Sequence, residues 1–161
     1  MALEITSVMG ILAIKLAIVT FLFWATMGSA VASPQIQAVN VRMFLQYSGE
    51  LSPPLNGQMP LWNIVIGERG ISEPTSAALV DVVVSGPRNT FGGKHVIRLA
   101  VKSERSGKVL ERSMGRLGIF GPSAETHVGF WLPSVGCEPL VITASIAGNS
   151  KTLVVPFRCG E

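Results

Sequence analysis

Apolar residues after position 33 recur at alternate positions in short runs, and no stretch of that region shows a sustained helical period. This alternation is typical of β-strands that bury one face, because successive side chains of a strand point to opposite sides of its sheet. The predicted strands are Val39–Tyr47, Leu61–Ile66, Val80–Val84, Ile97–Val101, Val109–Met114, Val128–Leu132, Leu140–Ala147 and Lys151–Arg158. Eight strands between turn signals predict an all-β domain, namely a two-layer antiparallel β-sandwich that is Ig-like in the broad sense. A small barrel is the alternative.

Residues 1–32 differ from the rest of the chain, since 23 of them are apolar. Lys15 precedes an apolar run, Leu16–Thr26, and the segment closes on Ala30-Val31-Ala32. This order is typical of a secretory signal peptide, and a run of about eleven residues is short for a membrane span, which needs roughly 17–25. We therefore expect cleavage after this segment. The alternative is an uncleaved N-terminal hydrophobic helix that anchors the protein in a membrane, because Ile5–Ile14 is apolar as well.

Residues 33–161 are long enough to form a single β-sandwich domain with its own core. The leader predicts a periplasmic or extracellular location, or an inner-membrane-anchored domain that faces the periplasm if the leader stays. Basic residues are scattered along the chain, whose net charge is +3. Glu104 and Glu111 interrupt the densest basic stretch, Arg98–Arg116, so the pattern favours a solvated surface and not a nucleic-acid interface.

The last two predicted strands are close enough in sequence to form a hairpin whose register can be predicted. If Gly148-Asn149 is a two-residue primed turn, apolar residues of one strand face apolar residues of the other. Pro156 has no N–H to donate to a ladder, which predicts that the last strand lies at a sheet edge. The predicted facing pairs are Leu140 with Phe157, Ile142 with Val155, and Ala144 with Leu153.

Cys137 and Cys159 fall at the open end of this hairpin and are the two cysteines of the chain. Their positions miss the register by one residue, which a bulge at Glu138-Pro139 would absorb. Because an exported chain meets oxidising conditions, we expect a structural disulfide that closes the hairpin and stabilises the fold by roughly 3 kcal/mol. A metal pair or a redox pair is the alternative, and the absence of a C-x-x-C motif or a local His argues against both.

Side chains that carry catalysis are scarce, since Asp81 is the one Asp and His95 and His127 are the two histidines. Asp81 falls on the strand face opposite three valines, which predicts a surface carboxylate, and the G-x-S-x-G motif of a serine nucleophile is absent. No M-x-M or H-x-H grouping supports a copper site. We therefore expect no catalytic residues, no metal and no cofactor. The copper ligands considered are His95, His127, Met43, Met59 and Met114.

The most distinctive loop lies between the second and third predicted strands. It contains Glu68 and Arg69, followed by Glu73, and Trp62 lies just before it. Loops on a rigid sandwich often carry binding residues, so these four residues form the candidate binding loop. The two glutamates could also act as a glycosidase pair, but catalytic carboxylates project from several elements across a sugar-sized groove, and a polar loop is the favoured interpretation.

Phe130 and Trp131 project from opposite faces of one predicted strand. Phe130 joins Val128 and Leu132 in the predicted core, so Trp131 points outward. Trp131 then either packs in a further apolar layer, which is the commoner outcome, or is exposed as an interface anchor for a partner.

The ending of the chain, from Val135-Gly136-Cys137-Glu138-Pro139-Leu140 through Phe157-Arg158-Cys159-Gly160-Glu161, resembles small, uncharacterised exported proteins of Gram-negative bacteria. The stretches Leu61–Asn63 and Ile66–Glu68 strengthen this resemblance. The resemblance implies a periplasmic location and no particular activity. Fimbrial subunits also combine a leader, an Ig-like sandwich and one disulfide. Their cysteines join early strands, whereas both cysteines of this chain lie near the C-terminus.

These features predict an exported, non-enzymatic β-sandwich that works as a binding or accessory module of the bacterial envelope, with another envelope protein as its partner. One alternative is a membrane-tethered subunit of a larger envelope complex, in which residues 1–32 stay in the membrane. Another alternative is a periplasmic metal-binding protein or small enzyme.

Overall fold

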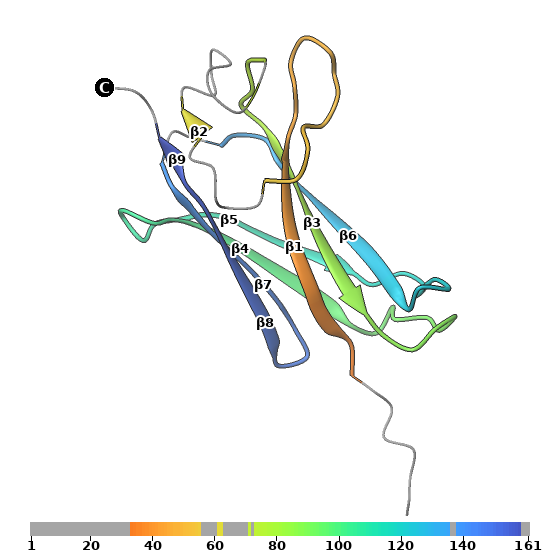
Figure 1. Cartoon of the computed structure of the whole chain (residues 1–161). Helices are drawn as coiled ribbons and strands as arrows, with labels where there is room; N and C mark the ends of the chain where they lie inside the picture. Colours follow the sequence, from red (N-terminus) through yellow and green to blue (C-terminus); the bar gives the residue numbers. More distant parts are fainter. Residues whose placement is uncertain (1–32, 56–60, 63–70, 72, 136–137, 159–161) are drawn as a thin grey trace, which may run out of the picture. The chain divides into compact units, whose positions relative to one another are not determined.

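Two antiparallel sheets form the domain in the computed structural model, which describes residues 33–55, 61–62, 71, 73–135 and 138–158. One sheet has three strands in the order β1-β3-β6, and the other has four in the order β5-β4-β7-β8 (Figure 1). The short strands β2 and β9 form a parallel pair apart from them. The strands are β1 (Gln35–Met43), β2 (Leu61–Trp62), β3 (Ala78–Ser85), β4 (Val96–Ser103), β5 (Val109–Arg116), β6 (Glu125–Leu132), β7 (Leu140–Ile146), β8 (Asn149–Val155) and β9 (Phe157–Arg158).

The prediction of an all-β fold is confirmed for the described residues. Every neighbouring pair of strands within the two larger sheets is antiparallel. The same residues contain no helix, and so none that is long and apolar enough to cross a membrane. The two sheets pack on one another as the layers of a sandwich. The predicted N-terminal helix falls within residues 1–32, which lie outside the described part of the chain.

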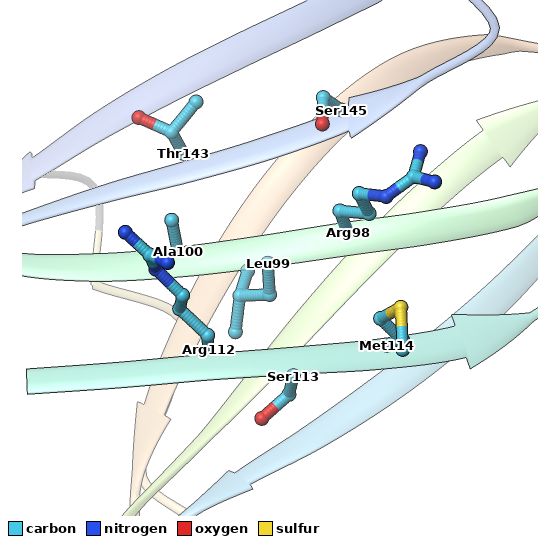
Figure 2. Close-up of a pocket in the computed structure, with 8 residues that line it drawn as sticks. All are labelled: Arg98, Leu99, Ala100, Arg112, Ser113, Met114, Thr143 and Ser145. Carbon is cyan, nitrogen blue, oxygen red and sulfur yellow. The ribbon is translucent and has the colours of Figure 1, made fainter.

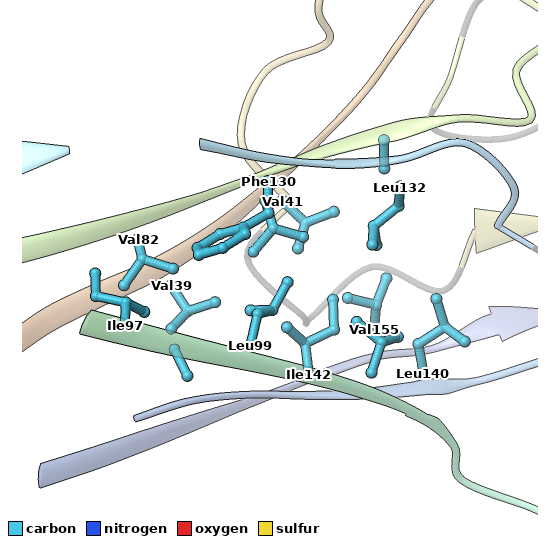
Figure 3. Packing of buried hydrophobic residues seen from close by; sticks show 14 of the residues in the cluster. Val39, Val41, Val82, Ile97, Leu99, Phe130, Leu132, Leu140, Ile142 and Val155 are labelled. Atoms are coloured by element: carbon cyan, nitrogen blue, oxygen red, sulfur yellow. The ribbon is translucent and has the colours of Figure 1, made fainter. Parts of the chain in front are cut away.

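The core lies between the two sheets and contains side chains from both (Figure 3). In β4, Ile97, Leu99 and Val101 are buried, and β3, β6 and β7 also bury alternate residues. Each aliphatic side chain that leaves water in this way contributes about 1.5–3 kcal/mol to folding. All members of the core cluster among the described residues lie between Ile36 and Phe157, within one compact unit, Ala32–Glu161.

Strand β1 ends at Met43, so its predicted continuation to Tyr47 is wrong. The Met43 N–H donates a hydrogen bond to the Ser52 hydroxyl, and the Leu45 N–H donates one to the Glu50 carbonyl. These bonds turn the chain back on itself directly after the strand. Tyr47 therefore lies on a loop, where it is 81% exposed.

The turn of the β7–β8 hairpin is Ala147-Gly148, one residue earlier than predicted. Both residues have a positive φ, 47° and 80°, as a type I′ turn requires. Asn149 instead begins β8, and its side-chain oxygen accepts a hydrogen bond of 3.0 Å from the Ile36 N–H. The observed facing pairs are Leu140 with Val155, Ile142 with Leu153, and Ala144 with Lys151.

The predicted facing pairs of this hairpin are therefore wrong by two positions, a shift that leaves each side chain on its predicted face. Strand β8 lies at the edge of its sheet, as Pro156 predicts. After Pro156 the chain leaves this sheet, and Phe157–Arg158 pairs with Leu61–Trp62. Phe157 is buried there and does not face Leu140.

Gly115 lets the free edge of β5 approach the opposite sheet closely. A Cβ atom at this position would lie 2.6 Å from Cγ1 of Val128 and 3.1 Å from the ring of Phe130. Side chains of β6 therefore cover β5 at this point and close one side of the sandwich.

We expect the Gly115→Ala substitution to lower the free energy of unfolding by about 1–3 kcal/mol, because the new methyl group overpacks a site with no room for it. Urea unfolding of residues 33–161 measures the change. Gly118→Ala is the matched control, since its Cβ would lie 3.7 Å from the nearest atom, Oγ1 of Thr126. Equal losses in the two variants would contradict the close approach of β5 and β6.

We expect the Ala147→Asn substitution to raise the free energy of unfolding by about 1 kcal/mol. A left-handed backbone costs an Ala roughly 1–2 kcal/mol, whereas Asn-Gly is the preferred pair of a type I′ turn. The same urea titration measures the gain. A loss of stability would contradict a turn at Ala147-Gly148.

Candidate functional site

The outward face of the four-stranded sheet contains an open concavity of about 490 Å³ (Figure 2). Ala100 lies at its centre, facing Arg112 on β5 and Thr143 on β7. Because its side chain is a single methyl group, Ala100 forms a low floor between longer neighbours. The lining residues are Arg98, Leu99, Ala100, Arg112, Ser113, Met114, Thr143 and Ser145.

Two arginines from different strands flank this floor. Arg112 reaches from β5 across toward β4, and Arg98 extends from β4 on the side of Ser145 (Figure 2). Met114 faces Arg98 across the β4–β5 pair and is 73% exposed. The concavity therefore presents two guanidinium groups, the hydroxyls of β7 and one apolar side chain.

Four cationic side chains on this face form a zigzag row, which we call the basic ladder. Its members alternate between β5 and β4 in the order Arg116, Arg98, Arg112 and Lys102, and all four are exposed. Each lies diagonally across the strand pair from the next, at about 7–8 Å. One cation therefore occurs at every two-residue step along the strands, an interval of about 6.8 Å.

No ion pair involves the basic ladder among the described residues, where the recorded pair joins His127 and Asp81 on the other sheet. Glu111 alternates to the other face of β5, where its carboxylate accepts hydrogen bonds from the Arg112 N–H at 3.1 Å and the Ser113 hydroxyl at 2.8 Å. Like charges at the ladder's spacing repel one another, so an anion bound along it would relieve that repulsion.

Glu73 is the candidate binding-loop residue whose side chain the structure describes. Its Oε2 accepts hydrogen bonds from the backbone N–H groups of Ser48 and Tyr47, both at 2.9 Å, and from the Ser48 hydroxyl at 3.3 Å. The Ser48 backbone bond is the largest cause that lowers the pKa of Glu73 below its usual range. This carboxylate holds the loop that follows β1.

The other candidate binding-loop residues are described less fully. Trp62 pairs with Arg158 through the backbones of β2 and β9. Glu68 and Arg69 lie outside the described residues. The gathering of these side chains into one binding loop stays a prediction.

Trp131 points to the outer face of the three-stranded sheet and is 50% exposed. Its ring packs edge-on against Phe44, with 5.5 Å between ring centroids and 74° between ring planes. Phe44 lies directly after β1, so a side chain from the loop covers part of the indole. The use of Trp131 as an interface anchor stays a prediction.

Asp81 on β3 and His127 on β6 form an ion pair on the outward face of the three-stranded sheet, which the sequence did not predict. Nδ1 of His127 lies 2.9 Å from Oδ1 of Asp81. No hydroxyl group bonds to His127 among the described residues, and these residues contain no group of three or more His, Cys, Asp or Glu that could hold a metal ion.

Cys137 and Cys159 lie outside the described part of the chain, so their disulfide stays a prediction.

No protein-family model and no curated protein matches the chain.

The basic ladder was missed at the level of sequence because Glu104 and Glu111 interrupt its stretch of chain. The alternation of residues along the strands does contain a signal for the ladder. The cations of β4 and β5 have even residue numbers and so share one face, whereas Glu111 has an odd number and lies on the other face. The row itself emerges only when the β4–β5 register places Ala100 opposite Arg112.

We expect the Glu73→Gln substitution to lower the melting temperature at pH 7, because the amide accepts the backbone hydrogen bonds of Tyr47 and Ser48 less strongly than a carboxylate. Folding lowers the pKa of Glu73, so its carboxylate contributes fully to folding stability above the unfolded pKa, about 4.3. This contribution is lost as the pH falls through the pKa of the folded protein. Melting curves of both proteins from pH 7 to pH 3 should therefore converge at the acid end. A difference that stays constant over this range would contradict the role of the charge.

Proposed function

We propose that this protein is an exported, non-enzymatic β-sandwich that serves as a binding or accessory module of the bacterial envelope, and that it binds through the basic ladder. One observation carries the proposal: four exposed cations stand in a row with no ion-pair partner among the described residues. An uncompensated row of one sign raises the rate of encounter with a partner of the opposite sign and excludes like-charged surfaces.

The proposed partner is another envelope protein that presents an extended acidic segment. The ladder offers one cation about every 6.8 Å, and an extended chain presents the side chains of one face at the same interval. A segment with acidic residues at alternate positions would therefore place one carboxylate opposite each cation. Arg98 and Arg112 suit this role, because a guanidinium group can bind a carboxylate through two parallel hydrogen bonds.

We also propose that the sandwich is Ig-like. An Ig domain places its strands A, B and E in one sheet and C, F and G in the other, with C′ beside C in some types. The observed order supports the assignment of β1, β3 and β6 as A, B and E, and of β4, β7 and β8 as C, F and G. Strand β5, next to β4, then takes the place of C′.

Export is supported by the apolar leader, residues 1–32, with its closing Ala30-Val31-Ala32. The mature domain would then work in the periplasm or outside the cell, and Cys137 and Cys159 would form the disulfide expected there. Retention of the leader would make the same domain a tethered subunit.

We expect residues 33–161 to bind a short synthetic peptide of alternating Glu and Thr at low ionic strength, with affinity that falls as salt is added. The double substitution Arg98→Ser and Arg112→Ser should weaken this binding about tenfold, since two surface ion pairs contribute on the order of 1.4 kcal/mol. Isothermal titration calorimetry or fluorescence anisotropy measures the affinity.

The matched control is the double substitution Arg88→Ser and Arg105→Ser, which removes the same charge from exposed positions off the ladder. A peptide of the same composition with its glutamates clustered controls for spacing. If both double variants lose the same affinity, net charge and not the ladder explains the binding, and the proposal fails.

A further inference from the structure

Two large apolar side chains are exposed at one end of the domain. Phe91 is 74% exposed on the β3–β4 loop, and Ile119 is 66% exposed on the β5–β6 loop. An isolated antiparallel bridge joins these two residues, so their side chains belong to one small patch. We call this patch the apolar tip.

Fraying of the loops does not explain this exposure, because hydrogen bonds and packing hold both loops. The Asn89 N–H donates to the Phe120 carbonyl, and the Phe120 N–H donates to the Thr90 carbonyl. The Phe120 side chain is 2% exposed, one position from the exposed Ile119. A Cβ at Gly93 would lie 2.1 Å from the ring of Phe91, so that ring rests on the Gly93 backbone. The apolar tip is therefore presented outward by an ordered support.

Cationic side chains outnumber acidic ones around the apolar tip, where the exposed Glu125 at the start of β6 follows the β5–β6 loop. Arg88 and Lys94 are exposed on the β3–β4 loop, and Arg116 is exposed at the end of β5. The loop segments 86–95 and 117–124 contain no acidic residue. This combination of apolar side chains and nearby cations suits binding to a layer whose surface is anionic and whose interior is apolar.

The chain enters the domain at the same end. Gln35, the first residue of β1, pairs with Ser85 at the close of β3, which in turn pairs with Glu125 at the start of β6. Figure 1 shows the start of β1 at the same end of the domain as the β3–β4 and β5–β6 loops. In the sequence, Ser33 and Pro34 alone separate β1 from the apolar segment 1–32.

We propose that the apolar tip docks this end of the domain onto an anionic phospholipid surface. Phe91 and Ile119 would enter the boundary between headgroups and acyl chains, while Arg88, Lys94 and Arg116 contact the phosphates. A lipid surface fits better than a protein partner, because the tip consists of two exposed side chains, whereas a stable protein interface buries about 800 Å² on each partner. The proposal goes beyond the proposed function, since its apolar side chains lie at the end of the sandwich, where Arg116 is the one residue that also belongs to the basic ladder.

The test measures partition of residues 33–161 onto sucrose-loaded vesicles of phosphatidylcholine with or without phosphatidylglycerol. This fragment carries the whole core cluster, so it is suited to the measurement. We expect sedimentation with the anionic vesicles and a fall in partition of at least about tenfold for the double substitution Phe91→Ser and Ile119→Ser. Melting temperatures should stay unchanged, because both side chains are exposed.

Tyr47→Ser is the matched control, since Tyr47 is 81% exposed but follows β1 at its opposite end. The ladder variant Arg98→Ser with Arg112→Ser separates the two proposals, and it should keep its vesicle partition while losing the acidic peptide. Equal vesicle partition of the tip variant and the wild type would overturn the inference, as would a loss confined to the ladder variant. Neither result bears on binding of the peptide.

Discussion

Burial of one face of strands β1, β3, β4, β6 and β7 between the two sheets is the constraint on which the rest of this structure depends. In β4 the core takes Ile97, Leu99 and Val101, so Arg98 and Lys102 must face outward. A slip of one residue would place these two cations in the core, at a cost of several kcal/mol for each unpaired ion. The buried layer and the outward direction of the ladder cations on β4 are thus two consequences of the same alternation.

Strand β5 connects the core to the ladder face. It lies at the edge of the four-stranded sheet, and every second residue of it is exposed. Gly115 allows β6 side chains to cover one side of it, and Arg112 and Arg116 project from the other side. Charged side chains on an edge strand also oppose pairing with the edge of another sheet. The position that leaves these arginines free for a partner therefore protects the edge at the same time.

Most strand positions could be predicted because alternation and turn residues are local signals. The errors lie where a distant residue supplies a hydrogen bond. Asn149 joins β8 because its side chain bonds the Ile36 N–H, and β1 ends at Met43 because Ser52 bonds the Met43 N–H. Local preference for glycine and asparagine in turns contains no information about such partners. The loop around Glu73 belongs to the same class, since its carboxylate bonds the backbone of Tyr47 and Ser48.

The amino-acid sequence by itself determined which face of β3, β4, β6 and β7 is apolar and hence that these strands stack in sheets around one core. Only the tertiary structure decided which surface residues become neighbours. Arg98 and Arg112 meet diagonally because of the β4–β5 register, and Phe91 and Ile119 meet because two loops bond to one another. The physical reason is that burial depends on the period of each segment alone, whereas a surface site depends on hydrogen bonds between segments far apart in the chain.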